Sequence, residues 1–384
     1  MKKHFLSAIL FFTIIMISAQ VYEFENVIDI EASSVKSQGR TGTCWSFSTS
    51  SFIESEVFMK TGKNIDLSEM YTVRNIYDDK AWNYVMRQGK SQFSEGGLAH
   101  DVINSIRKNG IVPETVFSGI KLNGKTYNHG NIIPALKIVL DDYIKNDKDS
   151  KHPNWKKHVE KILDNEIGKK LSKFTYEGIE YTPKSFAESL KLNADEYVTI
   201  TSFNHIPFYT NFILSIPDNF SNGEMLNVPL NTLVETVNYI LKNGYTIALD
   251  VDVSEETFSA KYGIAVLPKK DKNNSLSKTE IVNEIEVTQA FRQKEFENFD
   301  TTDDHLMHIV GIVKDQKGNR YFKVKNSWGA NSDRIGNNGY VYMSVPYFKM
   351  KAISILVNKN ALPKNIQKKI KNSYLETLTS PFID

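Results

Sequence analysis

The chain changes character along its length, from helical periodicity in its first third to strand-like runs in its last third. Three early segments carry apolar residues at helical spacing: 44–60, 67–87 and 98–108. Three late segments are strand-like, and a hairpin connection over 315–319 joins the last two: 245–253, 305–313 and 321–328. This order predicts an α+β fold with a helical half, a sheet half and a cleft between them.

The first residues of the chain have the composition of an export signal. Lys2 and Lys3 precede a run of 13 almost wholly apolar residues, 5–17, and Ala19 supplies a small residue at the cut. This run is shorter than the roughly 20 residues that span a bilayer. We therefore expect removal of 1–19, a secreted or periplasmic mature protein, and no membrane association after cleavage.

The charge balance argues against nucleic acid as a partner. The formal net charge is +2, and removal of the two lysines in the signal brings it to zero. Proteins that bind nucleic acid or anionic membranes usually carry a basic excess. We therefore expect neither as the main partner.

The chain contains one cysteine, Cys44, and therefore no internal disulfide. A lone thiol is either a buried small hydrophobe or a reactive group kept for chemistry. The loop 33–43 leads directly into the helix expected from Cys44, and a helix N-terminus lowers the pKa of a thiol. Gln38 on this loop either donates to an oxyanion together with the Cys44 N–H or is a solvated loop residue.

A cysteine nucleophile needs a base, and the segment 305–313 offers two histidines. In a strand, His305 and His308 lie on opposite faces, so only one of them faces a given cleft. The same alternation makes them a poor pair of metal ligands, although Asp303 and Asp304 leave a metal site as an alternative. These residues by themselves do not decide which histidine acts.

Four segments resemble the motifs of papain-type cysteine peptidases, in the order of that family. Segment 38–47 has a glutamine six residues before Cys-Trp, and segment 304–311 has a glycine six residues after His305. Segment 325–329 reads Lys-Asn-Ser-Trp-Gly, and segment 95–97 reads Glu-Gly-Gly. The resemblance implies a papain-like two-lobed fold, with a helical lobe, a β-barrel-like lobe and an active-site cleft between them.

The resemblance also implies a role for individual residues. The implied catalytic residues are Cys44 as nucleophile, His305 as base, Asn326 as the residue that orients the base, and Gln38 as oxyanion donor. The implied substrate-binding residues are Gly96 and Gly97, whose backbone binds the substrate chain, and Trp328, which also shields the histidine–asparagine bond from water.

Two departures from the papain pattern refine the resemblance. Thr41 and Ser94 stand where papain-type enzymes usually carry a disulfide. The separation of Cys44 and His305 far exceeds the roughly 130–150 residues usual in the family, which makes the middle of the chain an insertion. The chain in this respect resembles the bleomycin hydrolase and aminopeptidase C branch. Members of that branch lay their own C-terminus in the cleft, which implies Asp384 as a substrate anchor.

Periodicity and resemblance together predict five parts: a signal peptide 1–19, a helical lobe with the nucleophile 20–114, an inserted subdomain 115–229, a β lobe with the histidine and asparagine 230–358, and a C-terminal tail 359–384. The predicted activity is hydrolysis of peptide bonds through a Cys44 thioester. The predicted enzyme is an aminopeptidase, and its substrate is a peptide or protein. We expect a thiolate–imidazolium pair and no metal or organic cofactor. An endopeptidase, an acyl transferase and an inactive peptide-binding homologue are alternatives, and homo-oligomerisation stays open.

Overall fold

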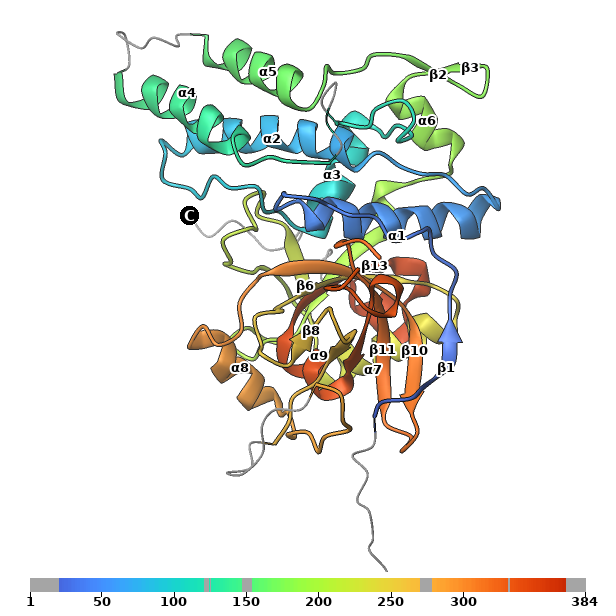
Figure 1. Ribbon diagram of the computed structural model, residues 1–384. Coiled ribbons are helices and arrows are strands. Elements are labelled where there is room, and N and C mark those ends of the chain that lie inside the picture. Colours follow the sequence, from blue (N-terminus) through green and yellow to red (C-terminus); the bar gives the residue numbers. More distant parts are fainter. Residues whose placement is uncertain are drawn as a thin grey trace, which may run out of the picture.

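A computed structural model describes residues 21–120, 124, 126–146, 154–269, 278–330 and 332–370 (Figure 1). The predicted signal peptide 1–19 and the predicted substrate anchor Asp384 lie outside the described residues. So does most of the predicted tail 359–384, of which only the part up to residue 370 is described.

The helical lobe is built on three helices that match the predicted segments: α1 Cys44–Thr61, α2 Glu69–Met86 and α3 Ala99–Asn109. The Ser68 hydroxyl accepts a hydrogen bond from the Tyr71 backbone N–H and so begins α2. Gly62 ends α1 in the left-handed conformation. Three further helices lie in this lobe: α4 Ile132–Asn146, α5 Trp155–Glu166 and α6 Pro183–Ser189.

Most strands of the described chain form one sheet of 11 strands, in the order β5-β6-β4-β13-β7-β10-β11-β12-β9-β8, with β1 paired to β10. Its strands are β1 Phe24–Asp29, β4 Tyr197–Thr201, β5 Asn211–Ile213, β6 Glu224–Asn227, β7 Ile247–Val251, β8 Phe258–Ser259, β9 Ile264–Ala265, β10 His305–Asp315, β11 Arg320–Lys325, β12 Tyr340–Ser344 and β13 Ala352–Asn358. Neighbouring strands run antiparallel except β4 with β6 and β9 with β12. The sheet forms the lower lobe in Figure 1.

Shorter elements complete the two lobes. The helices of the β lobe are α7 Leu230–Lys242, α8 Gln289–Glu297 and α9 Val345–Lys351. A separate hairpin joins β2 Phe174–Tyr176 to β3 Ile179–Tyr181. The short 3-10 helices are η2 Ala194–Glu196, η3 Asn337–Gly339 and η4 Lys359–Ala361.

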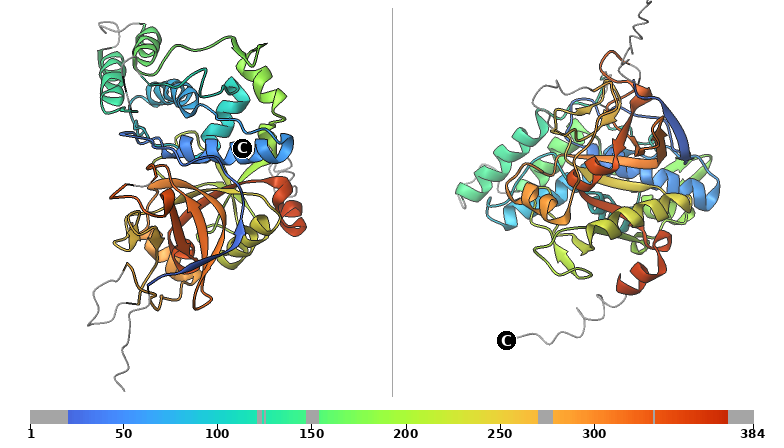
Figure 2. Two further views of the ribbon diagram at one scale, coloured as in Figure 1. Left: turned by 45° about the vertical axis from the view of Figure 1, so that its right-hand side comes forward. Right: turned by 90° about the horizontal axis from the view of Figure 1, so that it is seen from below.

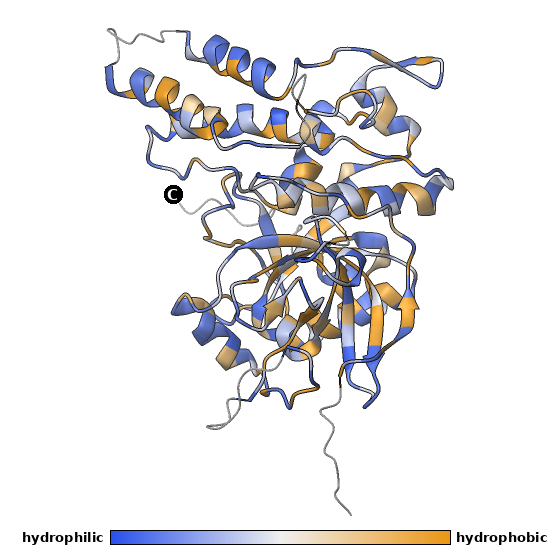
Figure 3. Cartoon of the chain, in the orientation of Figure 1, coloured by the Kyte–Doolittle hydropathy of each residue, from blue (hydrophilic) through white to orange (hydrophobic). Residues whose placement is uncertain are grey.

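The segment predicted as an inserted subdomain, 115–229, is divided between the two lobes rather than folded by itself. Figure 3 shows both polar and apolar residues along α4 and α5. Apolar side chains of these helices, such as Leu136 and Leu163, are buried in the core of the helical lobe. The later part of the segment supplies β4, β5 and β6, which extend the sheet of the β lobe through β13. The approach segment after the signal also joins that sheet, because β1 pairs with β10.

Helix α1 lies between the lobes and packs on both of them, as Figure 2 shows from the side. Most of its residues are buried, including several serines. The Ser48 hydroxyl donates to the Met307 carbonyl oxygen of β10 at 2.6 Å and so links α1 to the sheet. This position explains why α1 has no single apolar face, since it has no broad solvent face.

Among the described residues, no helix is both long and apolar enough to cross a membrane.

Candidate active site

Cys44 is the first residue of α1, and its side chain is only 7% exposed. The Leu306 backbone N–H donates to the Cys44 sulfur at 3.5 Å, so the sulfur lies against the peptide that follows His305. In the loop before Cys44, glycine allows the backbone to lie very close to a neighbouring segment. Gly39 has a φ of +62°, and a β-carbon there would lie 2.5 Å from the Tyr127 carbonyl oxygen, so a larger residue would displace the loop.

His305 is held by the asparagine that the sequence predicts. His305 Nε2 lies 2.8 Å from Asn326 Oδ1, and the Ser327 backbone N–H donates to the same Oδ1 at 2.7 Å. A backbone N–H only donates, so the shared atom is the carboxamide oxygen, and His305 Nε2 carries the proton. His305 Nδ1 is therefore the basic nitrogen, which is the state that a general base requires.

The indole of Trp328 covers this hydrogen bond. Its ring lies 4.7 Å from the His305 ring, centroid to centroid, at an interplanar angle of 34°. Phe258 packs against Trp328, with the two rings edge-on at 5.9 Å between centroids. Both His305 and Asn326 are almost completely buried. The histidine–asparagine bond is thus kept in a dry environment, where it is stronger than in water.

Gln38 is fixed in one orientation close to these residues. Its Nε2 donates to the Thr41 carbonyl oxygen at 2.6 Å, and its Oε1 accepts from the Ser327 hydroxyl at 2.6 Å. Its backbone N–H also donates to the Ser327 carbonyl oxygen at 2.8 Å, which ties the nucleophile loop to the asparagine segment. One N–H of the carboxamide has no partner in these bonds, and its use as an oxyanion donor stays a prediction.

Burial disfavours a charge on Cys44 and on His305. Burial, with a smaller contribution from the charges of nearby aspartates, raises the pKa of the Cys44 thiol to about 12, against the opposing effect of the Leu306 hydrogen bond. Burial also lowers the pKa of His305 to about 4, against the opposing effect of the Asn326 hydrogen bond. A charge on either group by itself is costly in this dry site. The thiolate–imidazolium pair expected from the sequence stays a prediction, because its two opposite charges would stabilise each other.

Glu95 links the nucleophile loop to the glycine pair, a role that the sequence did not reveal. Its carboxylate accepts a hydrogen bond from the Gly42 backbone N–H at 2.5 Å, and its carbonyl oxygen accepts from Trp45 Nε1 at 2.9 Å. Glu95 follows Ser94, one of the two positions at which papain-type enzymes usually carry a disulfide. The hydrogen bond from Gly42 to Glu95 therefore lies next to the place of that disulfide. The connection between the loop and the glycine pair is thus made without a covalent bond.

The glycine pair itself adjoins the nucleophile helix. Gly97 lies against the indole of Trp45, and Lys80 donates its ammonium group to the Gly96 carbonyl oxygen. The Asp218 carboxylate covers the α-carbon of Gly96 so closely that a β-carbon there would overlap it. Asp218 lies between β5 and β6 in a segment without a recognisable motif, and no sequence signal points to it.

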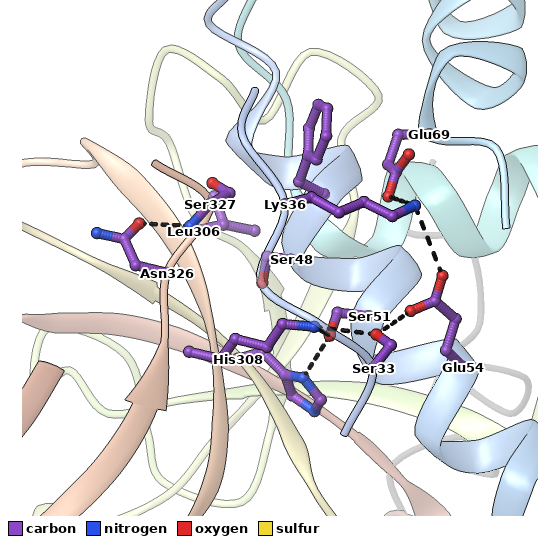
Figure 4. A pocket seen from close by; sticks show the side chains of 12 residues that line it. Ser33, Lys36, Ser48, Ser51, Glu54, Glu69, Leu306, His308, Asn326 and Ser327 are labelled. Atoms are coloured by element: carbon purple, nitrogen blue, oxygen red, sulfur yellow. Dashed lines mark hydrogen bonds and ion pairs between the residues drawn. The ribbon is translucent and has the colours of Figure 1, made fainter. Parts of the chain in front are cut away.

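His308 lies where β10 packs against α1, close to Ser51 (Figure 4). Its Nδ1 lies 2.9 Å from the Ser51 hydroxyl, which also accepts from Lys325 Nζ at 2.7 Å. Lys325 donates to Ser33 as well, and the Ser33 hydroxyl donates to Glu54. The cavity at this network measures about 10 Å³, which is too small for a peptide side chain. The network therefore holds the lobes together beside Asn326.

The ionic groups of this network continue to Lys36. Lys36 Nζ lies 2.7 Å from Glu69 and 4.0 Å from Glu54. Burial raises the pKa of Glu69 to about 8 and lowers the pKa of Lys325 to about 8. The described part of the chain contains no group of three or more His, Cys, Asp or Glu side chains able to hold a metal ion.

Two family profiles match the chain. The profile of the peptidase C1-like family matches residues 163–379. The chain belongs to the peptidase C1-like family. The profile of the papain family cysteine proteases matches residues 25–165 of the same C1-like chain. The predicted family and the predicted α+β, papain-like fold are both confirmed.

Curated relatives of this C1-like chain extend over most of its length. It is 22% identical to "Aminopeptidase G" of Lactobacillus delbrueckii subsp. lactis, over 91% of this chain and 86% of that protein. It is 23% identical to "Aminopeptidase C" of Listeria monocytogenes, over 88% of this chain and 83% of that protein. A solved structure, PepW from a Lactobacillus, has the same fold with a TM-score of 0.71 and 21% identity, covering 92% of this chain and 86% of that one.

The structure brings together most of the residues that the sequence singled out: Gln38, Cys44, Gly96, Gly97, His305, Asn326 and Trp328. The roles assigned to them remain predictions. Asp384 lies outside the described residues.

Proposed function

We propose that this chain is a cysteine aminopeptidase that removes N-terminal residues from peptides through a Cys44 thioester. The observation that supports this most directly is that Cys44, His305 and Asn326 lie close together. The Leu306 amide contacts the Cys44 sulfur at 3.5 Å, while His305 bonds to Asn326 at 2.8 Å. The names of its curated relatives, "Aminopeptidase G" and "Aminopeptidase C", support an exopeptidase.

The reaction begins with proton transfer from the Cys44 thiol to Nδ1 of His305 as the sulfur attacks the carbonyl carbon of the scissile bond. The negative charge on the carbonyl oxygen is stabilised by the Cys44 backbone N–H and the remaining N–H of Gln38. The imidazolium then protonates the leaving amine, and the C–N bond breaks to give the thioester. Water attacks the thioester with His305 as general base, which releases the acid and restores the thiol.

Asn326 acts by fixing the tautomer of His305 throughout this cycle. Because its carboxamide oxygen accepts from Nε2, the ring proton stays there and Nδ1 alternates between base and acid. The hydrogen bond also disperses the positive charge that develops on the imidazole, which burial otherwise makes costly.

The test is turnover of aminoacyl fluorogenic amides against their N-acylated counterparts, together with labelling by an epoxide thiol inhibitor. We expect faster turnover of the free amines, one label per chain, and loss of both label and turnover in Cys44→Ala. Preferred cleavage of the N-acylated substrates would replace the aminopeptidase with an endopeptidase. A labelled protein that forms new amides with an added amine, instead of hydrolysing substrate, would indicate an acyl transferase.

We also infer that residues 1–19 direct export, so that the mature enzyme is secreted or periplasmic. Lys2 and Lys3 followed by the apolar run 5–17 support this proposal. N-terminal sequencing of the protein isolated from its own cells tests it. We expect the mature chain to begin at Gln20, and a cytosolic protein that retains Met1 would contradict the inference.

A further inference from the structure

Three acidic side chains lie close to Cys44, and one of them, Asp218, lies against the glycine pair. Asp218 lies on the connection between β5 and β6, Asp250 lies on β7, and Asp303 lies two residues before His305. Their charges all act on Cys44, since after burial they raise the pKa of its thiol. They are not needed to activate that thiol, because negative charge opposes formation of a thiolate. The mechanism derived above therefore leaves them without a role.

The Asp218 carboxylate is positioned by contacts that leave one oxygen available. Oδ1 accepts from Gln92 Nε2 at 2.9 Å and from the Ser94 hydroxyl at 3.5 Å. Oδ2 lies nearest to the α-carbon of Gly96, where a β-carbon would overlap it. The acid thus covers one side of the glycine whose backbone the sequence predicts to bind substrate.

Behind Asp218, Asp250 and Asp303 form a pair of adjacent carboxyl groups. Asp250 is only 2% exposed, and its Oδ2 accepts from the Ser354 hydroxyl at 3.3 Å. The two carboxyls hydrogen-bond to each other, and burial raises the pKa of both of them. They share a proton, because two negative charges at one buried site are costly. Asp303 also accepts from the Asp218 backbone N–H, so the pair helps to position Asp218, which is itself only partly buried.

Two buried cations lie near these acids, but among the described residues neither forms an ion pair with Asp218. Arg292 is completely buried and acts on Asp250. The Lys80 ammonium group donates to the Gly96 carbonyl oxygen, lies 5.2 Å from the centre of the Phe220 ring and acts on Asp218 only at a distance. The side chains that bond directly to the Asp218 carboxylate, Gln92 and Ser94, are neutral, so this carboxylate can still accept from a cationic donor.

An α-ammonium group matches this environment in charge and in hydrogen bonding, because it carries one positive charge and three donors. We propose that Asp218, supported by Asp303 and Asp250, binds the free N-terminal ammonium group of the peptide substrate. Asp218 then also blocks the space beyond Gly96 in which a longer or acylated chain would continue. This inference rests on the proposed peptidase function and assigns its specificity to the segment 115–229.

Asparagine substitution at Asp218 tests the charge with little change of shape. In Asp218→Asn, we expect kcat/KM for aminoacyl amides to fall about 10- to 100-fold, mainly through KM, because a charge-assisted hydrogen bond is lost. The N-acetylated substrate should not lose activity, so the preference for free amines collapses. Asp218→Ala also removes the obstruction, and its turnover of N-acetylated substrate should rise above wild type.

Asp195→Asn is the matched control, because Asp195 lies in the same segment but pairs with Arg107 at the surface. It should behave as wild type. Alkylation of Cys44 by a neutral haloacetamide should persist in every variant and so reports an intact nucleophile. A further variant that lacks residues 381–384 removes the C-terminal carboxylate predicted as an alternative anchor.

The outcomes separate the two proposals. If wild type shows no preference for free amines, the aminopeptidase assignment fails. If wild type has the preference and Asp218→Asn keeps it in full, only the present inference is overturned. The inference is likewise overturned if the preference disappears in the truncated variant while Asp218→Asn retains it.

Discussion

The bond between Glu95 and Gly42 provides a sharp test of how the nucleophile loop is held. The Glu95 carboxylate accepts from the Gly42 backbone N–H at 2.5 Å, two residues before Cys44. The Trp45 indole bonds to the Glu95 carbonyl oxygen and does not depend on its side chain. Glu95→Ala therefore removes one defined contact and leaves the neighbouring one in place.

The expected loss of stability follows from this contact. A hydrogen bond to a charged group contributes about 1.5–3 kcal/mol, and the partial exposure of this pair reduces the figure to about 1–2 kcal/mol. A chain of 384 residues has an unfolding entropy of roughly 0.8 kcal/mol per kelvin at about 2.1 cal/mol/K per residue. The melting temperature should therefore fall by only about 1–3 °C.

The effect on catalysis should be larger than the effect on stability. The loop from Gln38 to Cys44 carries both proposed oxyanion donors, and one such donor is worth roughly 10²-fold in kcat. A loop freed at Gly42 no longer holds these donors in place, so we expect kcat to fall by about 10-fold or more. KM should change less, because Gly96 and Gly97 keep their positions.

The assay combines calorimetry with steady-state kinetics on an aminoacyl fluorogenic amide. Glu95→Gln is the matched control, since its amide oxygen can still accept from Gly42 and its losses should be smaller. Introducing Thr41→Cys and Ser94→Cys into the Glu95→Ala protein places thiols where papain-type enzymes carry a disulfide. The oxidised form should recover kcat, and its reduced form should not. Wild-type kcat in Glu95→Ala would refute the reasoning.

Three further predictions concern buried groups. Asn326→Ala should lower kcat roughly 10²-fold or more with little change in KM, because His305 Nε2 loses its acceptor; equal turnover in stopped-flow assays would contradict this. When the pH falls from 7 to 4, the wild type should lose about 3 kcal/mol of folding stability that the His129→Gln variant keeps. Burial lowers the pKa of His129 to about 4, so the unfolded wild type binds a proton below pH 6.5 that the folded protein excludes; urea unfolding at both pH values measures the difference. Lys325→Met should destabilise the protein by about 3 kcal/mol in the same assay, because it leaves buried Glu54 with less positive charge; an unchanged midpoint would show that the network is not needed.

Much of the fold could be predicted from the sequence where the signal is local. The segment 44–60 is helical in the structure as Cys44–Thr61, and 305–313 is a strand as His305–Asp315. These elements have strong periodicity or apolar runs, which depend only on neighbours in the chain. By contrast, β1 Phe24–Asp29 was missed, because it is largely exposed and forms only through pairing with β10.

In the candidate site, too, some features could be predicted from the sequence and others could not. The residues predicted as nucleophile, base and orienting group are recognisable in the sequence because such chemistry restricts the residue type and its immediate neighbours. His305, Asn326 and Trp328 then meet as predicted. The cost of a charge on Cys44 or on His305 was not predictable, because it depends on how deeply packing buries each group.

The sequence by itself determined the chemistry and the order of the two lobes, since motif and periodicity are written in consecutive residues. Only the tertiary structure decided that the segment 115–229 is shared between the lobes, that Glu95 reaches Gly42, and that Asp218 covers Gly96. Each of these contacts joins residues far apart in the chain and uses a side chain with no fixed neighbours. Such contacts arise from the path of the folded backbone, which brings donors, acceptors and charges together without leaving a pattern in the sequence.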